Sequence, residues 1–123
     1  MANIDLKPLR YIEVVVTDVL GDNFIINPFD SNGNVLSEIT IVVDSTLATA
    51  IVTLPSISTL NYNWGIKINV VATKGATNDV QVYSDSTTPD TIGSMPKVQL
   101  NTDGANAECT IVSETIWSAV VTL

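Results

Sequence analysis

The sequence predicts an all-β fold, an antiparallel β-sandwich or jelly-roll-like domain of about ten short strands. Of the 123 residues, 46% are hydrophobic but only 6% are aromatic, so the apolar content is mainly Val, Ile, Leu and Ala, accompanied by much Thr. β-Branched side chains are stiff at χ1 and pack well on a pleated sheet. Short runs that alternate apolar and polar residues recur between turn residues, which is typical of strands.

The first predicted strands are two apolar runs, residues 11–16 and 23–29, the second of which leads into a turn at 30–34. Asn32-Gly33 lies between two apolar runs, and both central residues of a type I′ turn need a positive φ, so this dipeptide predicts a hairpin. Residues 35–44 are then the returning strand. Further strands are expected at 50–54, 65–71, 79–84, 91–92, 97–101, 107–113 and 116–122.

The alternation also predicts which side chains form the core, since every second residue of a strand points to the same face. The residues expected in the core are Ile66, Ile68, Val70, Val80, Val82, Ile111 and Val120. Helical periodicity is weak throughout, and no repeat of a fixed period is evident. The length fits one core, with residues 35–123 as the β-sandwich domain and residues 1–34 as an N-terminal arm or an added hairpin.

The first ten residues fit neither a good strand nor a good helix. Pro8 removes a backbone donor and biases the residue before it towards an extended conformation. We therefore expect an assembly arm that orders against a partner, with an ordinary frayed terminus or a first edge strand as the open alternative. The candidate contact residues of this arm are Leu6, Lys7, Leu9 and Arg10.

Charge and composition argue against several classes of partner. Charged residues are 15% of the chain, below the usual ~25%, and the net charge is −8. An acidic field repels phosphate backbones and anionic lipids, so neither nucleic acid nor membrane is an expected partner. The start lacks a basic region and a continuous apolar run, so no secretory signal is expected.

The residues needed for most enzyme chemistry are missing. Without histidine the chain lacks the commonest general base and metal ligand, and the lone Cys109 excludes a thiolate zinc site. Most acidic residues fall in turns, where aspartate caps backbone donors. We therefore expect no enzyme activity, no catalytic residues, no cofactor and no metal. The string 30–34 has alternate oxygen ligands like a calcium loop, but its glycine falls fourth rather than sixth, so a hairpin is preferred and calcium binding stays open.

One loop offers aromatic side chains in a polar setting. Tyr62, Asn63 and Trp64 form a segment of the kind that stacks on a sugar ring or anchors a protein contact. Packing of Trp64 as a loop plug is the alternative, since large aromatic residues are common in that role. The loop carries the alternative function for the chain, a carbohydrate- or receptor-binding β-module.

A series of turn and strand motifs resembles a β-domain of bacteriophage structural proteins: head-decoration proteins, head fibres and tail-fibre segments. The resemblance covers residues 38–123, about two-thirds of the chain. Its motifs are a strand ending in Leu54-Pro55, a strand begun by Gly65, the strand 78–82, the element Asp90-Thr91-Ile92-Gly93, the turn 100–104 and a final strand with Trp117.

The resemblance implies a virion component, made in the cytoplasm of a bacterial host, with no catalytic residues. It also implies association of identical copies, commonly as a homotrimer, and contact with the major capsid protein or other virion proteins. The low charge density agrees, because a free monomer would expose wide faces rich in Val and Thr. The expected function is that of an auxiliary, decoration or head-fibre protein of a capsid.

Overall fold

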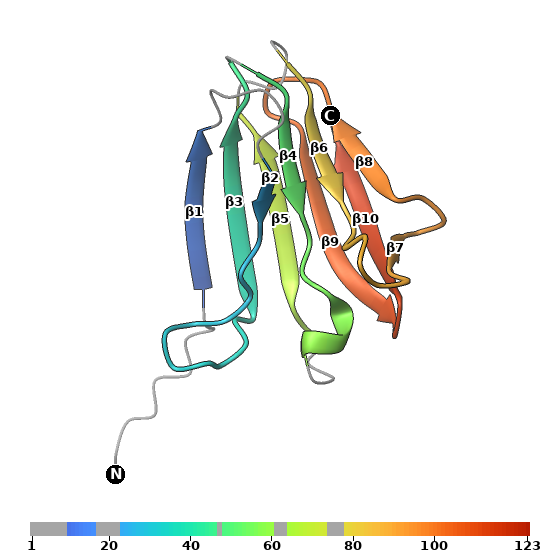
Figure 1. Ribbon diagram of the computed structural model, residues 1–123. Helices are drawn as coiled ribbons and strands as arrows, with labels where there is room; N and C mark the ends of the chain where they lie inside the picture. The colour runs from blue at the N-terminus through green and yellow to red at the C-terminus, as the bar shows by residue number, and fades with distance from the viewer. Residues whose placement is uncertain (1–9, 17–22, 47, 61–63, 74–77) are drawn as a thin grey trace.

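The computed structural model describes residues 10–16 (as backbone), 23–46, 48–60, 64–73 and 78–123, and these residues form an all-β fold, as predicted (Figure 1). Ten strands and one short 3-10 helix are present in the described ranges. They are β1 (Arg10–Val16), β2 (Asn23–Ile25), β3 (Glu38–Asp44), β4 (Ala50–Thr53), η1 (Ile57–Leu60), β5 (Lys67–Ala72), β6 (Val80–Tyr83), β7 (Thr91–Ile92), β8 (Lys97–Leu100), β9 (Asn106–Ser113) and β10 (Ile116–Thr122).

The strands form two sheets, and the chain passes from one to the other at almost every step. Sheet A has the order β1-β3-β5-β9-β10-β7, and sheet B has the order β2-β4-β6-β8. The first six strands alternate between the sheets, and within each sheet they pair in parallel. This winding is a β-solenoid, so the predicted antiparallel sandwich or jelly roll is wrong. Hairpin connections would have kept consecutive strands in one sheet.

The parallel register shows a repeat that the sequence conceals. In sheet A, Arg10 lies opposite Glu38, and Glu38 lies opposite Lys67. In sheet B, β2 pairs with β4 and β4 with β6 at similar separations along the chain. Each coil of the solenoid therefore takes roughly 30 residues, a period typical of repeat architectures. The unequal lengths of the turns hide this repeat from a search at one fixed period.

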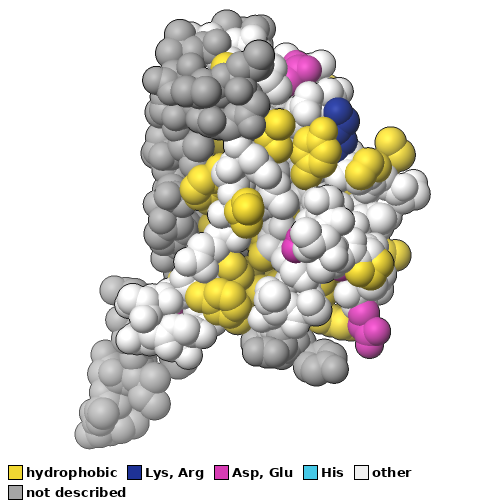
Figure 2. All heavy atoms as spheres, in the orientation of Figure 1, with side chains coloured by type: hydrophobic (Ala, Val, Ile, Leu, Met, Phe, Trp, Pro, Cys, Tyr) yellow, Lys and Arg dark blue, Asp and Glu magenta, His cyan; other side chains and the backbone are white. Residues whose placement is uncertain are grey.

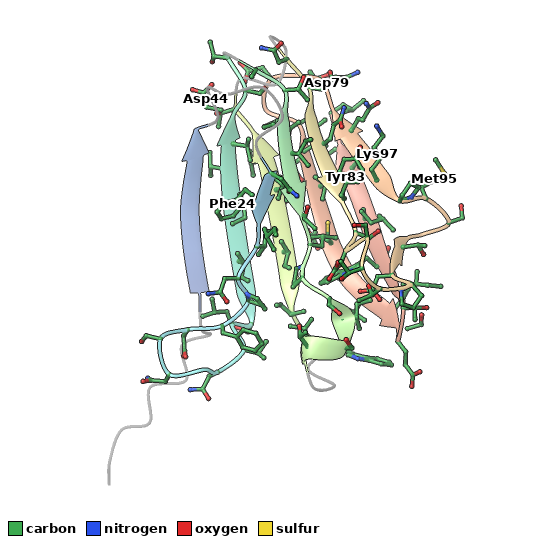
Figure 3. The ribbon with its side chains drawn as sticks, in the orientation of Figure 1. Phe24, Asp44, Asp79, Tyr83, Met95 and Lys97 are labelled. Carbon is green, nitrogen blue, oxygen red and sulfur yellow. The ribbon has the colours of Figure 1, made fainter. Side chains whose placement is uncertain are left out.

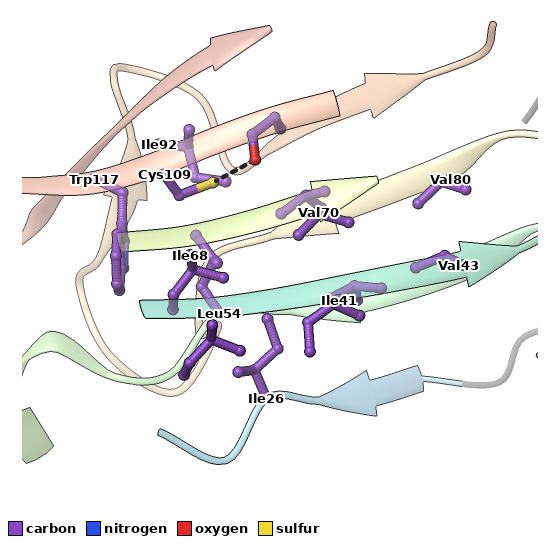
Figure 4. Close-up of a cluster of buried hydrophobic side chains, with 14 of the residues drawn as sticks. Ile26, Ile41, Val43, Leu54, Ile68, Val70, Val80, Ile92, Cys109 and Trp117 are labelled. Atoms are coloured by element: carbon purple, nitrogen blue, oxygen red, sulfur yellow. Dashed lines mark hydrogen bonds between the residues drawn. The ribbon is translucent and has the colours of Figure 1, made fainter. Parts of the chain in front are cut away.

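The core lies between the two sheets and is built from the inward-facing residues of successive coils (Figure 4). Equivalent positions stack on one another: Ile39 on Ile68, Ile41 on Val70, and Val43 on Ala72. Trp117 of β10 is fully buried at one end of this core. Removing such side chains from water is the main stabilising contribution to a fold of this kind.

Six of the seven predicted core residues are confirmed. Ile66, Ile68, Val70, Val80, Val82 and Ile111 are all buried. The prediction for Val120 is wrong, since this side chain is 64% exposed. Trp117 fixes the inward face of β10, so Val120, three positions later, must point outward.

The winding changes at the C-terminal end of the solenoid, where most pairings are antiparallel and only that of β7 with β10 is parallel among the described residues. β8 pairs antiparallel with β6, and β9 pairs antiparallel with β5 and then with β10. In sheet A, β9 therefore brings Cys109 beside Ile68 and Ala107 beside Val70. The apolar rows of the coils continue across these strands, which completes the core at this end.

Only the turn of the predicted hairpin around Asn32-Gly33 is present, without two paired strands beside it. The Gly33 amide donates to the carbonyl of Asp30 at 3.1 Å, and Gly33 has a φ of 83°. This is a turn followed by a left-handed glycine, rather than the two-residue type I′ loop expected. One bridge, Phe29 to Val35, follows the turn. The flanking strands then separate into different sheets, so residues 35–44 are not the returning partner of residues 23–29.

The boundary predicted at residue 34 lies in this small hairpin. β1 is the outermost strand of sheet A on its N-terminal side, and β2 holds the same place in sheet B. Residues 10–16 and 23–25 thus share both sheets with the rest of the chain. Whether residues 35–123 fold independently stays a prediction, and residues 1–9 lie outside the described part.

Polar side chains hold successive coils together at the turns. The Asn78 side-chain amide donates to the carbonyls of Ser45 at 2.8 Å and Thr46 at 3.0 Å. At the opposite end, buried Asp90 accepts a hydrogen bond of 2.9 Å from the backbone amide of Ile57, the first residue of η1. Buried backbone groups need such partners, so these contacts fix how one turn sits on the next.

Candidate binding surfaces

The predicted aromatic loop is described at one residue only. Trp64 is 37% exposed and lies just before β5, in the turn that follows η1. Partial exposure fits both a binding role and a loop plug. Tyr62 and Asn63, the other two residues of this predicted site, lie outside the described residues.

The predicted assembly arm is likewise only partly placed. Leu6, Lys7 and Leu9 lie outside the described residues. Arg10 is the first residue of β1, and its backbone pairs with Glu38 of β3. The residue therefore begins a strand of sheet A, in line with the alternative of a first edge strand for this position, while the arm itself stays a prediction.

Cys109 and Lys67 are ionisable residues whose surroundings the structure shows. Burial, followed by the charge of Glu108, raises the pKa of the Cys109 thiol to about 12. A thiol with so high a pKa is almost entirely protonated at neutral pH and is a poor nucleophile. On the outer face of sheet A, Lys67 Nζ lies 3.6 Å from Glu108 Oε1.

In the possible calcium loop, residues 30–34, backbone amides of the loop itself donate hydrogen bonds to the Asp30 carboxylate. Asp30 Oδ1 accepts hydrogen bonds from the amides of Asn32 at 2.8 Å and Asn34 at 2.9 Å. The bond from Asn34 is the largest of the causes that lower the pKa of this carboxyl. Within the described ranges, no three acidic or cysteine side chains gather in a way that would hold a metal ion.

A shallow, open hollow of about 360 Å³ lies on the outer face of sheet B. Ile51 and Thr53 of β4 lie between two walls, one from β2 and the other from Tyr83 of β6. The residues that line it are Asn23, Ile25, Ile51, Thr53, Tyr83, Ser84, Asp85, Ser86 and Thr87. Figure 2 views this side of the molecule and shows hydrophobic side chains among many uncharged polar ones.

Tyr83 is the aromatic wall of this hollow, and neighbours on both sides fix its position. Lys97, its partner on β8, places its ammonium 5.5 Å from the centroid of the ring, a cation–π distance (Figure 3). The Tyr83 hydroxyl lies 3.3 Å from Gln81 Oε1. Contacts with Lys97 and Gln81 therefore fix the position of the ring.

Sequence reasoning missed this hollow although a signal was present. The alternation of residues 79–84 places Tyr83 and Gln81 on the outer face if Val80 and Val82 are inside, which the core prediction had stated. Asn23 and Ile25, however, come beside them only because β2, β4 and β6 occupy the same place in successive coils. The parallel winding brings these residues together, and the expected hairpins would not have done so.

A second group of exposed apolar residues lies on the last two strands. Val112 on β9 is 57% exposed, Val120 on β10 is 64% exposed, and Leu123 at the end of the chain is 76% exposed. Isolated exposed apolar residues are ordinary on a protein surface. Val112 and Val120 lie on adjacent strands of sheet A, but the register places Val120 opposite Glu108 and Val112 near the turn that joins β9 to β10.

No protein-family model matches this chain, and a search of curated proteins finds no significant match. Among the described residues, no helix has the length and apolar character that a membrane crossing requires.

Proposed function

We propose that this protein is a non-enzymatic structural component of a bacteriophage particle, an auxiliary, decoration or head-fibre protein that works as a homotrimer. The resemblance over residues 38–123 supports the assignment to virion proteins. The solenoid winding supports a structural role, because stacked coils give a rigid body whose stability grows with each neighbouring coil. The main partners would be its own copies and the major capsid protein or other virion proteins.

The single observation that carries the proposal is the exposed apolar surface of β9 and β10. Val120 points away from the core at 64% exposure, on the same outer face as Val112 of β9, which is 57% exposed. Copies that met through these residues would remove them from water, and each buried methylene contributes ~0.8 kcal/mol. A threefold arrangement would close on itself and leave no free copy of the surface.

The oligomeric state tests the assembly part of this proposal. Light scattering coupled to size exclusion should give a mass of about three times the 13.1 kDa of one chain at micromolar concentration. Val120→Glu should shift the mass towards the monomer without loss of the β-sheet signal in circular dichroism. The matched control is Met95→Glu, since Met95 is 57% exposed but lies in the turn between β7 and β8. A wild-type protein with the mass of a single chain would refute the trimer.

The assignment to a phage particle is tested by looking for the protein in purified particles. Mass spectrometry of purified phage particles should find the protein at a copy number that is a multiple of three. Deletion of residues 2–10 tests the predicted arm: loss of binding to particles by a folded variant supports it. Full occupancy by the truncated protein would place the attachment surface on the sheets or their turns. Absence of the protein from every particle fraction would overturn the virion assignment.

A further inference from the structure

We propose that the hollow on the outer face of sheet B binds a neutral saccharide, with Tyr83 as the wall on which a pyranose ring packs. The inference rests on the geometry of β2, β4 and β6 and does not depend on a role in a virion. It also uses a different surface from the aromatic loop that ends at Trp64.

The shape of the hollow suits a flat ligand of moderate size. Its volume of about 360 Å³ lies at the lower end of the ~300–1,000 Å³ typical of small-molecule sites. Ile25, 66% exposed, forms one wall and Tyr83 the other, and β4 runs between them. Strands give a rigid base, so the hollow is already formed before a ligand arrives, and binding requires little ordering of the protein.

Tyr83 supplies the contact that a sugar ring needs. The C–H faces of a pyranose are apolar, and an aromatic ring offers a large, stiff surface for them with a polar hydroxyl at its end. Because Lys97 and Gln81 already hold the Tyr83 ring, little side-chain freedom would be lost on binding.

The rim supplies both donors and acceptors for hydroxyl groups. Thr53 Oγ1 donates to Asn23 Oδ1 at 2.7 Å, which orients the Asn23 side chain and leaves its amide hydrogens as donors for a ligand. Thr87 donates to Asp85 Oδ1 through its amide at 2.9 Å and its hydroxyl at 2.7 Å, so Asp85 Oδ2 remains as an acceptor. Sugar hydroxyls can pair with both kinds of group.

The charges in and around the hollow favour a neutral ligand over a polyanion or a polycation. In a chain with net charge −8, the lining has one carboxylate, Asp85, and the ammonium of Lys97 lies 5.5 Å from the centroid of the Tyr83 ring. A polyanion would meet the overall acidic field with a single ammonium to offset it, and a polycation would find only one carboxylate in the hollow. An uncharged ligand with apolar faces and many hydroxyls matches both the walls and the rim.

Nuclear magnetic resonance with defined sugars tests the proposal. Isotope-labelled wild-type protein is titrated separately with maltohexaose, cellohexaose and N-acetylchitohexaose, each to about 10 mM, which detects even millimolar dissociation constants. At least one of these should shift the backbone amide signals of β2, β4, β6 and residues 84–87. Tyr83→Ala should weaken that binding by about tenfold or more. Ile25→Glu tests the opposite wall with an exposed residue whose replacement leaves the core intact.

The controls separate this site from the other surfaces. Trp64→Ala removes a partly exposed aromatic residue elsewhere and should leave binding unchanged, as should Met95→Glu. The inference is overturned if none of the three sugars shifts these signals, or if only an anionic sugar such as polygalacturonate does. It is also overturned if Trp64→Ala abolishes binding while Tyr83→Ala does not, or if Ile25→Glu converts an oligomer into monomers, because a second copy would then occupy the hollow.

Discussion

Adjacent residues of β3 face opposite environments, so replacing each by alanine tests the winding of the chain. Ile41 is fully buried and stacks on Val70 of the next coil, whereas Val42 is on the outer face of sheet A. Ile41→Ala removes three buried carbons, which lowers the free energy of unfolding by about 2.4 kcal/mol at ~0.8 kcal/mol per carbon. The cavity left between the sheets raises this loss to about 3–4 kcal/mol. Val42→Ala removes two partly exposed carbons and should lower the free energy of unfolding by less than about 1 kcal/mol.

Urea unfolding followed by circular dichroism measures both variants under the same conditions. Thermal unfolding should show a fall in Tm of about 10–15 °C for Ile41→Ala and of less than about 4 °C for Val42→Ala, given the size of the chain. Equal losses for the two variants, or a larger loss for Val42→Ala, would show that the inward and outward faces of β3 are assigned wrongly. The stacking of coils described above would then be incorrect.

Three further predictions concern the turns and the cysteine. Asp90→Ala removes the acceptor for the buried amide of Ile57, so unfolding should become easier by about 1–3 kcal/mol in the same urea assay, and Asp90→Asn should recover part of that loss. Gly33→Ala places a side chain at a φ of 83° and should cost about 1–2 kcal/mol, with a pH-independent effect in calorimetry. The Cys109 thiol should react with a disulfide reagent only after unfolding. Its pKa rises from 9.0 in the unfolded chain to about 12 in the fold. Stability should therefore fall as the pH rises from about 9 towards 12, and this part of the fall should vanish in Cys109→Ala.

The sequence predicted local structure well because alternation is a local property. A side chain such as Val70 or Val82 has polar neighbours on one or both sides, and burial of every second residue follows from the geometry of a strand. Val120 was assigned to the core by the same alternation, although its neighbours Ala119 and Val121 are apolar. Both Val120 and Val121 are apolar, so alternation alone could not choose between them, and only the inward position of Trp117 decides the phase.

Which strands are neighbours was much harder to predict. Asn32-Gly33 is a genuine turn signal, and Gly33 does adopt a positive φ, but a turn says nothing about what the chain does shortly afterwards. β2 and β3 lie in different sheets, and each pairs with the equivalent strand of an adjacent coil. The pairing of parallel strands is specified by long-range packing between coils. Such packing produces no short motif that could be recognised in the sequence.

The two candidate sites differ in how far apart their residues lie in the sequence. Trp64 could be identified because an aromatic residue in a polar loop is visible in the sequence. The hollow beside Tyr83 could not, because its two walls come from β2 and β6, which are two coils apart along the chain. A site assembled across coils is recognisable only when the register between the coils is known.

Consecutive coils lie in parallel register, and a disulfide between two coils tests this register most directly. Val42 and Val71 are register partners on the outer face of sheet A, and the neighbouring-strand separation of about 4.8 Å lies within the range that a disulfide spans. Asn106 is the partner of Val71 on the next strand, so Val42 and Asn106 are two strand spacings apart.

We predict that the double variant with cysteine at residues 42 and 71 forms an intramolecular disulfide under mild oxidation, seen as a loss of two free thiols by mass spectrometry. The control with cysteine at residues 42 and 106 should stay reduced, and the buried Cys109 should remain a free thiol in both. A disulfide in the control, with none between residues 42 and 71, would contradict the parallel winding and with it the site built on that winding.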